Sequence, residues 1–370
     1  CETAAESAIS SVAWPYADQR SAENGQALAV AMRPRFGELR RRLNQFPEAT
    51  HALVRMRSDL IVAMRTRPEL KNLDEELVDL FSTWFNKWFL ELRRIDWNTP
   101  ADILEKIIKY EAVHRIEGWD YLRPRIDPQD RCVYGFFHPR LANEPLIFVE
   151  VALVSRVPDA IGPLLAKDRV EHRAEQATTA VFYSISNCQS GLRRIPLGSF
   201  LIKQVVSDLQ RRYPRINTFV TLSPVPSFGV HLKRKWEAGT MTLPSGIADW
   251  TELETAIRQK SPSHIAEVEQ FLKQELAKYL LMERDAKGRV IDPVARFHLG
   301  NGARLERLNF GADQSERGQS ANLGMMVNYL YAFPDIEKNH ENYVNAGRVS
   351  ASQQIRRLAN VSQIAKSQHS

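Results

Sequence analysis

The chain has 370 residues, with 50 Lys and Arg residues against 44 Asp and Glu residues and a net charge of +6. Hydrophobic residues make up 44% and charged residues 25%, a globular composition that excludes a disordered or fibrous chain. The length predicts roughly two or three domains. No run of about 18 apolar residues occurs, so the sequence predicts no membrane span.

The three cysteines, Cys1, Cys132 and Cys188, cannot form a disulfide framework, and none lies in a Cys-x-x-Cys pair. We therefore expect a reducing compartment and no structural zinc. His114 and His138 lack suitably spaced partner ligands, so no metal site is predicted. Because the start also lacks the apolar core of a signal peptide, we expect a cytoplasmic protein.

The positive charge is unevenly distributed. Residues 1–96 contain 14 basic and 14 acidic residues, so the excess lies entirely in residues 97–370. Residues 182–236 hold nine basic residues against one acid, Asp208, a local net charge of +8. This density favours a polyanionic partner, either a nucleic acid or a phosphorylated cofactor, although a solvated basic face has the same composition.

The first part of the chain is predicted to be all helical. Residues 25–44 and 48–66 have helical patterns, and residues 68–96 carry apolar side chains at three- and four-residue steps. We predict the core of a helical bundle or an oligomer interface, and therefore self-association into dimers or tetramers.

A junction follows at residues 97–100. Thr99 is predicted to cap a new helix that has Pro100 at its first position and ends near His114. Beyond it, four β-rich runs alternate with helical segments, at residues 132–137, 146–153, 179–185 and 218–222. The predicted fold class is α+β, with a helical domain over residues 1–96 and a mixed-sheet domain over residues 97–370.

A polar turn with glycine and arginine joins the strand at 179–185 to a predicted helix. Such a turn places backbone N–H groups and a positive helix end at one point, which suits a diphosphate, although an ordinary strand-to-helix turn has the same form. It resembles the acyl-CoA loop of GNAT-type acyltransferases, Gln/Arg-x-x-Gly-x-Gly/Ala, at Arg193-x-x-Pro196-x-Gly198. Pro196 departs from that pattern and lacks an N–H donor.

Longer strings resemble one family within that fold, the malonyl-CoA decarboxylases. These strings occupy residues 144–153, 180–186, 197–203, 221–226, 292–302 and 323–331. The junction at 97–100 and residues 111–114 match too, and residues 1–96 resemble a short form of the family's helical oligomerisation domain.

The resemblance implies a GNAT-like sheet with helices on both faces and conversion of malonyl-CoA to acetyl-CoA and carbon dioxide through an enolate, without metal, biotin or another prosthetic group. It maps the functional Ser–His pair to Ser223 and His298. It maps the substrate loop to Arg193, Arg194, Ile195, Pro196, Leu197, Gly198 and Ser199. Asn328 and Tyr331 lie on a late strand, where they line the pocket or pack in the core.

The two residues of the pair have distinct expected roles. Ser223 precedes Pro224, which favours an extended backbone, and its hydroxyl is expected to contact the malonyl carboxylate or relay a proton. An unperturbed histidine has a pKa of about 6.5, so His298 is assigned as the acid that protonates the enolate carbon. The alternative is that His298 only orients Ser223.

Two other classes of function remain open from the residues. A GNAT-type acyl-CoA-dependent acyltransferase would need an acceptor amine, and Pro196 argues against it. A non-enzymatic binder of acyl-CoA or nucleic acid would use the basic window, but no nucleic-acid motif is present. The predicted partners are malonyl-CoA, acetyl-CoA and further copies of the chain, with no nucleic acid and no membrane.

Overall fold

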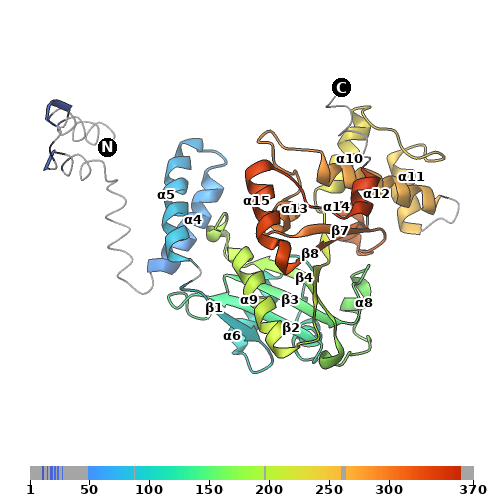
Figure 1. Ribbon diagram of the computed structural model, residues 1–370, viewed down its shortest axis with the longest axis horizontal. Coiled ribbons are helices and arrows are strands. Elements are labelled where there is room, and N and C mark those ends of the chain that lie inside the picture. Colours follow the sequence, from blue (N-terminus) through green and yellow to red (C-terminus); the bar gives the residue numbers. More distant parts are fainter. Residues whose placement is uncertain are drawn as a thin grey trace. The chain divides into compact units, whose positions relative to one another are not determined.

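The computed structural model describes residues 49–86, 88–195, 197–259 and 264–359, with isolated positions between 11 and 27 (Figure 1). The chain forms two compact units, Cys1–Asp74 and Glu75–Ser370. The helix expected over residues 25–44 lies almost wholly outside the described residues.

The first unit contains helix α4, Ala49–Ala63, which confirms the helix predicted over residues 48–66. A short 3₁₀ turn, η1 (Pro68–Leu70), leads into α5, Lys71–Trp84. The Nε of Arg57 on α4 donates to Asp74 Oδ1 at 2.8 Å, and both side chains are buried. Arg57 and Asp74 thus form a buried ion pair inside this unit.

The long helix predicted over residues 68–96 is wrong beyond Trp84. Asn86 donates to Thr83 O and accepts from Trp88 N, a local pattern that competes with helical hydrogen bonding. The chain then forms strand β1, Glu91–Ile95, which pairs with the sheet of the second unit. Residues 91–95 therefore do not belong to the expected all-helical region.

Eight strands form one mixed sheet, in the order β1-β2-β3-β4-β5-β8-β6, with β7 paired to β8. The remaining strands are β2 (Arg131–Phe137), β3 (Ile147–Val154), β4 (Thr179–Asn187), β5 (Thr218–Thr221), β6 (Ser223–Pro224), β7 (Arg304–Asn309) and β8 (Met326–Leu330). Strands β4 and β5 are parallel and the other pairs are antiparallel. The four predicted strands and the α+β class are confirmed.

Helices cover both faces of the sheet, as expected. Val133 and Phe137 of β2 pack in a core cluster with α6 (Ala101–Tyr110) and α7 (Trp119–Ile126). Side chains that alternate with them meet α9, Leu197–Arg212, which lies across the sheet in Figure 1. There Tyr134 donates to Asp208 at 2.9 Å and Phe136 stacks on Phe200.

The expected cap of α6 differs in detail. Pro100 is the residue that precedes the helix, and the Thr99 hydroxyl accepts from Asp96 N instead of from the helix. Proline has no side-chain oxygen that could accept from the first-turn N–H groups, so the helix starts without a side-chain cap.

Further helices complete the second unit. They are α8 (Gly162–Leu165), α10 (Phe228–Glu237), α11 (Trp250–Gln259), α12 (Ile265–Leu281), α13 (Pro293–Gly300), α14 (Glu316–Asn322), α15 (Ile336–Ala346) and α16 (Gln353–Leu358), with 3₁₀ turns η2 (Ala174–Gln176), η3 (Ser190–Leu192) and η4 (Phe333–Asp335). Within the described ranges, no helix is long and apolar enough to cross a membrane.

Candidate active site

The two parallel strands of the sheet diverge at one point. Strand β4 pairs with β5 only as far as Phe182 and Thr221, and Leu222 N adds a last bond to Phe182 O. Beyond this bond, β4 continues to Asn187 alongside β3. The segment that follows β5 instead enters β6, which pairs with β8. Strands β4 and β5 therefore separate beside Ser223.

Ser223 and His298 meet at this point although 75 positions separate them in the sequence. Ser223 Oγ lies 3.1 Å from His298 Nε2, and it donates to Thr221 Oγ1 at 2.9 Å. Thr221 Oγ1 also accepts from the backbone N–H of Tyr329 on β8. The expected Ser–His pair is therefore brought together on rigid elements.

Helix α13 carries His298 in its last turn. Asp292 caps this helix, because its Oδ1 accepts from the backbone N–H groups of Val294 and Ala295 at 2.9 Å. Pro293 occupies the first helical position, where its fixed φ suits a helix start. Asp292 was not among the expected site residues, although an aspartate before a proline is a helix-start signal.

Tyr331 contacts the other ring nitrogen of His298. Its hydroxyl lies 2.8 Å from Nδ1, and its backbone N–H donates to Phe219 O on β5. The ring of Tyr329 stacks on the imidazole with centroids 4.5 Å apart. Two nearby tyrosines thus hold His298, one through a hydrogen bond and one through ring contact.

The protonation of this group departs from the expectation. Burial lowers the pKa of His298 to about 3, so the imidazole is neutral at physiological pH rather than poised near 6.5. Burial raises the pKa of Tyr331, which keeps its proton. With Ser223 donating to Thr221, the consistent tautomer has the Tyr331 hydroxyl donating to Nδ1 and the Nε2–H donating to Ser223.

Asn328 lies on β8 but is engaged by the scaffold. Its Oδ1 accepts from Arg307 Nε and Asn309 Nδ2, and its Nδ2 donates to Thr221 O at 2.8 Å. It is fully buried. These bonds join β5, β7 and β8 behind the Ser–His pair.

The predicted phosphate loop joins β4 to α9. Arg193 and Arg194 are exposed at the surface, and Arg194 has a positive φ of 76°. Ile195 N donates to Leu192 O and Leu197 N donates to Ile195 O, so these two N–H groups are used within the loop. Pro196 and the side chain of Ser199 lie outside what the structure describes.

The basic window of residues 182–236 does not concentrate its charge at this loop. Arg211 and Arg212, in the last turn of α9, both pair with Asp208. Lys203 pairs with Glu337, and Lys235 pairs with Glu275 and Glu283. Of this window, Arg193 and Arg194 are the cations that the fold places within the loop itself.

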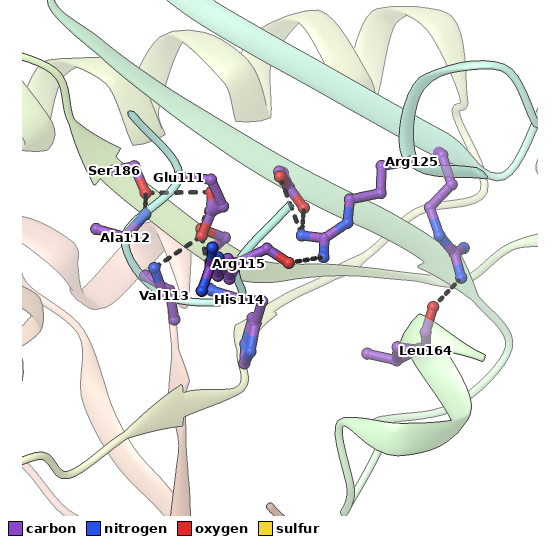
Figure 2. A network of polar contacts seen from close by, with 11 residues as sticks. Glu111, Ala112, Val113, His114, Arg115, Arg125, Leu164 and Ser186 are labelled. Carbon is purple, nitrogen blue, oxygen red and sulfur yellow. Dashed lines mark hydrogen bonds and ion pairs between the residues drawn. The ribbon is translucent and has the colours of Figure 1, made fainter. Parts of the chain in front are cut away.

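A second buried polar cluster lies along β4 (Figure 2). The Glu111 carboxylate, at the end of α6, accepts from the backbone N–H groups of Val113 and His114 at 2.8 Å. It also accepts from the hydroxyls of Ser184 and Ser186. The Glu111 carboxylate therefore links the segment after α6 to β4, the strand that leads to the phosphate loop, through hydrogen bonds.

Arg125 and Glu150 form a buried ion pair in the same region, at 3.0 Å. Burial and the neighbouring Glu111 carboxylate raise the pKa of Glu150 to about 7, against the effect of Arg125. Burial lowers the pKa of His114 to about 4. In the part of the chain that the structure describes, no cluster of three His, Cys, Asp or Glu residues could hold a metal ion.

The fold and this site define an α+β enzyme built around a buried Ser–His pair. Residues 3–85 match the family model of the malonyl-CoA decarboxylase N-terminal domain, and residues 88–369 match that of the C-terminal domain. The chain belongs to the malonyl-CoA decarboxylase family. The two family models meet ahead of β1.

Curated relatives agree with this assignment. The protein "Malonyl-CoA decarboxylase, mitochondrial" of Anser anser anser is 34% identical over 87% of this chain and 69% of the relative. The protein of the same name from Rattus norvegicus is 31% identical over 89% of this chain and 72% of the relative.

Solved structures of the family are also similar. Malonyl-CoA decarboxylase from Rhodopseudomonas palustris shares 47% identity at a TM-score of 0.85, over 95% of this chain and 86% of that chain. Malonyl-CoA decarboxylase from Agrobacterium vitis shares 47% identity at a TM-score of 0.86, over the same shares of the two chains.

Proposed function

We propose that this protein converts malonyl-CoA to acetyl-CoA and carbon dioxide, with no metal, biotin or other prosthetic group. The observation that carries the proposal is the Ser223–His298 pair, which lies at the divergence of β4 and β5 in a chain of this family. Both side chains are almost fully buried, so charge that develops between them would interact strongly with the hydrogen bonds around it.

The proposed substrate position follows from the fold. The first turn of α9, after Leu197, offers backbone N–H groups and a positive helix end to the diphosphate, next to Arg193 and Arg194. The part of β4 beyond Phe182, where β5 no longer pairs with it, would lie along the arm of CoA that joins the diphosphate to the thioester. The malonyl group would then lie against Ser223 and His298.

The reaction itself breaks one carbon–carbon bond. The bond between the α-carbon and the carboxylate carbon breaks, carbon dioxide leaves, and the electron pair stays on the α-carbon and spreads onto the thioester oxygen. Hydrogen-bond donors aimed at such an oxyanion are typically worth about 3–4 kcal/mol each. The Ser223 hydroxyl and the Nε2–H of His298 are the proposed donors. One proton must then reach the α-carbon, and solvent supplies it overall.

The neutral histidine of the free protein constrains how that proton arrives. The malonyl carboxylate would bring a negative charge next to His298, and an opposite charge nearby favours the protonated imidazole. We therefore place proton uptake at substrate binding. The imidazolium would face the carboxylate before decarboxylation and the enolate after it, and would give its proton to the carbon directly or through Ser223.

The test is a direct assay of the purified protein with malonyl-CoA. We expect equal amounts of acetyl-CoA and carbon dioxide without an added amine, at a rate that EDTA and avidin leave unchanged. No acetyl-CoA at micromolar enzyme would contradict the proposal, and acetyl transfer to an amine without carbon dioxide release would favour an acyltransferase.

Substitutions then test the pair. Ser223→Ala and His298→Gln are each expected to lower kcat roughly 10²- to 10⁴-fold with the melting temperature retained. Ser82→Ala is the matched control, because the exposed Ser82 hydroxyl on α5 donates to Val78 O of its own helix. A fully active Ser223→Ala or His298→Gln variant would remove the pair from the mechanism.

We also propose that the chain self-associates as dimers or tetramers. Two aromatic residues after α5 support this, because Trp88 is 82% exposed and Phe89 is 56% exposed in the single chain. Burial of such side chains favours association. Light scattering at micromolar concentration should give a multiple of the chain mass, and a monomer would contradict it.

A further inference from the structure

Gly198 is in close contact with a phenylalanine from a distant part of the chain. A β-carbon built on Gly198 would lie 2.1 Å from Cε2 and 2.3 Å from Cζ of Phe297. Real β-carbons essentially never approach another atom closer than 3.0 Å. The Phe297 ring therefore occupies the volume that a side chain at position 198 would need.

The backbone conformation of Gly198 does not explain the glycine. Gly198 is the second residue of α9 and is not among the residues with positive φ. Within a helix, glycine is less favourable than alanine, so local structure alone would favour alanine here. The acyl-CoA loop pattern that this segment resembles also admits alanine at its last position. The contact with Phe297 is what excludes it.

Phe297 leads directly to the Ser–His pair. It precedes His298 on α13, and the two rings are nearly perpendicular with centroids 5.1 Å apart. The next residue, Leu299, is buried, and Asp292 fixes the start of the helix. Because the two rings are in direct contact, a displaced Phe297 ring would press on the His298 imidazole.

We propose that Gly198 and Phe297 are positioning residues that set His298 against the diphosphate-binding turn. The inference rests on the proposed function, in which one CoA thioester contacts the start of α9 and the Ser–His pair together. The contact fixes the spacing between these two parts of the site. Misplacement of a reacting group by about 1 Å can cost a hundredfold in rate.

The first test is Gly198→Ala. We expect kcat for malonyl-CoA to fall roughly 10- to 100-fold, because the added methyl displaces the Phe297 ring and with it His298. The affinity for free CoA, measured by calorimetry, should change less than about threefold, since the first-turn N–H groups remain. Gly162→Ala is the matched control. Gly162 is the first residue of α8, and nothing lies within 4 Å of an added β-carbon there.

The second test relieves the clash. In the double variant Gly198→Ala/Phe297→Leu the smaller side chain makes room for the methyl, and kcat should recover at least half of the loss on a logarithmic scale. Phe297→Leu alone should be less impaired than Gly198→Ala. If Gly198→Ala does not fold, the double variant should fold and be active.

The outcomes separate the two proposals. An active wild type with a fully active Gly198→Ala variant would overturn the positioning contact and leave the proposed function intact. A double variant that is no better than Gly198→Ala, in folding or in kcat, would also overturn it, because the effect would not run through Phe297. A wild type that releases no carbon dioxide would refute the proposed function and this inference with it.

Discussion

The hydroxyl of Tyr331 lies 2.8 Å from Nδ1 of His298, the ring nitrogen opposite the one that faces Ser223. This contact selects the tautomer that donates from Nε2. Tyr331→Phe removes it, and a hydrogen bond to a group that becomes charged is worth about 1.5–3 kcal/mol. We expect kcat to fall roughly 10- to 100-fold while KM changes much less, as measured by steady-state kinetics.

Tyr329→Phe provides the matched control for that substitution. The Tyr329 ring stacks on the same imidazole, but its hydroxyl has no hydrogen-bond partner among the described residues. Phenylalanine keeps the stacking, so the variant should stay within about threefold of the wild type. Equal losses for both substitutions would argue against a role for the Tyr331 hydroxyl.

Proton uptake on substrate binding follows from the low pKa of His298 in the free protein. Calorimetry in buffers of different ionisation enthalpy, near pH 7.5, should show uptake of about one proton with a non-decarboxylating analogue that keeps the malonyl carboxylate. Acetyl-CoA lacks that charge and should give nearly none. The His298→Gln variant should show no difference between the two ligands, and an uptake that persists in it would place the proton elsewhere.

The loop arginines should affect binding more than turnover. Arg193→Ala and Arg194→Ala are each expected to raise KM for malonyl-CoA roughly 5- to 20-fold with little change in kcat, because a lost phosphate contact weakens ground state and transition state alike. Arg211→Ala, at the other end of α9 and paired with Asp208, should leave KM unchanged. An equal effect of all three would indicate a diffuse electrostatic field rather than a loop contact.

The buried histidine should also make the protein sensitive to acid. Its folded pKa is about 3, whereas the unfolded chain takes up a proton below about 6.5, so stability is present above 6.5 and is lost as the pH falls towards 3. Relative to His298→Gln, the wild type should lose up to about 1.4 kcal/mol of unfolding free energy per pH unit in that window. Urea unfolding of both proteins at several pH values measures this, and parallel curves would contradict it.

The buried pair of Arg57 and Asp74 predicts a large stability effect in the first unit. Asp74→Ala removes a carboxylate that accepts from the buried Arg57 guanidinium, and breaking such a buried pair should cost about 3–5 kcal/mol. Glu91→Ala is the control, since the Glu91–Arg93 pair is exposed and such pairs contribute about 0–1 kcal/mol. Calorimetry should give a clearly lower melting temperature for Asp74→Ala than for Glu91→Ala. Similar melting temperatures for the two variants would rule out a structural role for Asp74.

Much of the sheet could be predicted from composition because its central strands are buried on both faces. Strands β2 and β3 are buried at every position, and such strands appear in the sequence as short continuous apolar runs. Strand β1 was missed because Leu92 and Ile95 happen to continue the three- and four-residue spacing of the preceding helix. Strand β7 lacks a regular alternation because Glu306 and Arg307 are adjacent charged residues, at a point where the pairing with β8 shifts register.

The Ser–His pair was predicted by family resemblance, and of its surroundings Tyr331 was expected to line the pocket or pack in the core. Tyr329 reaches His298 through packing between β8 and α13, two segments that are distant in the sequence, and no local pattern encodes this contact. The pKa of His298 depends on burial, which exists only after the sheet and α13 have come together. The length of the helix at 68–96 was overestimated for the opposite reason, because a local turn at Asn86 overrode a regular apolar pattern.

Strand β8 comes last among the strands in the sequence, yet it pairs with three others, β5, β6 and β7. It also brings Tyr329 to His298 and leads directly into Tyr331. A ribosome releases the chain from its N-terminus, so β2 to β5 can be complete well before β8 emerges. The chemistry of this protein is therefore acquired late in synthesis, and a nascent chain has a largely formed sheet before it has a working site.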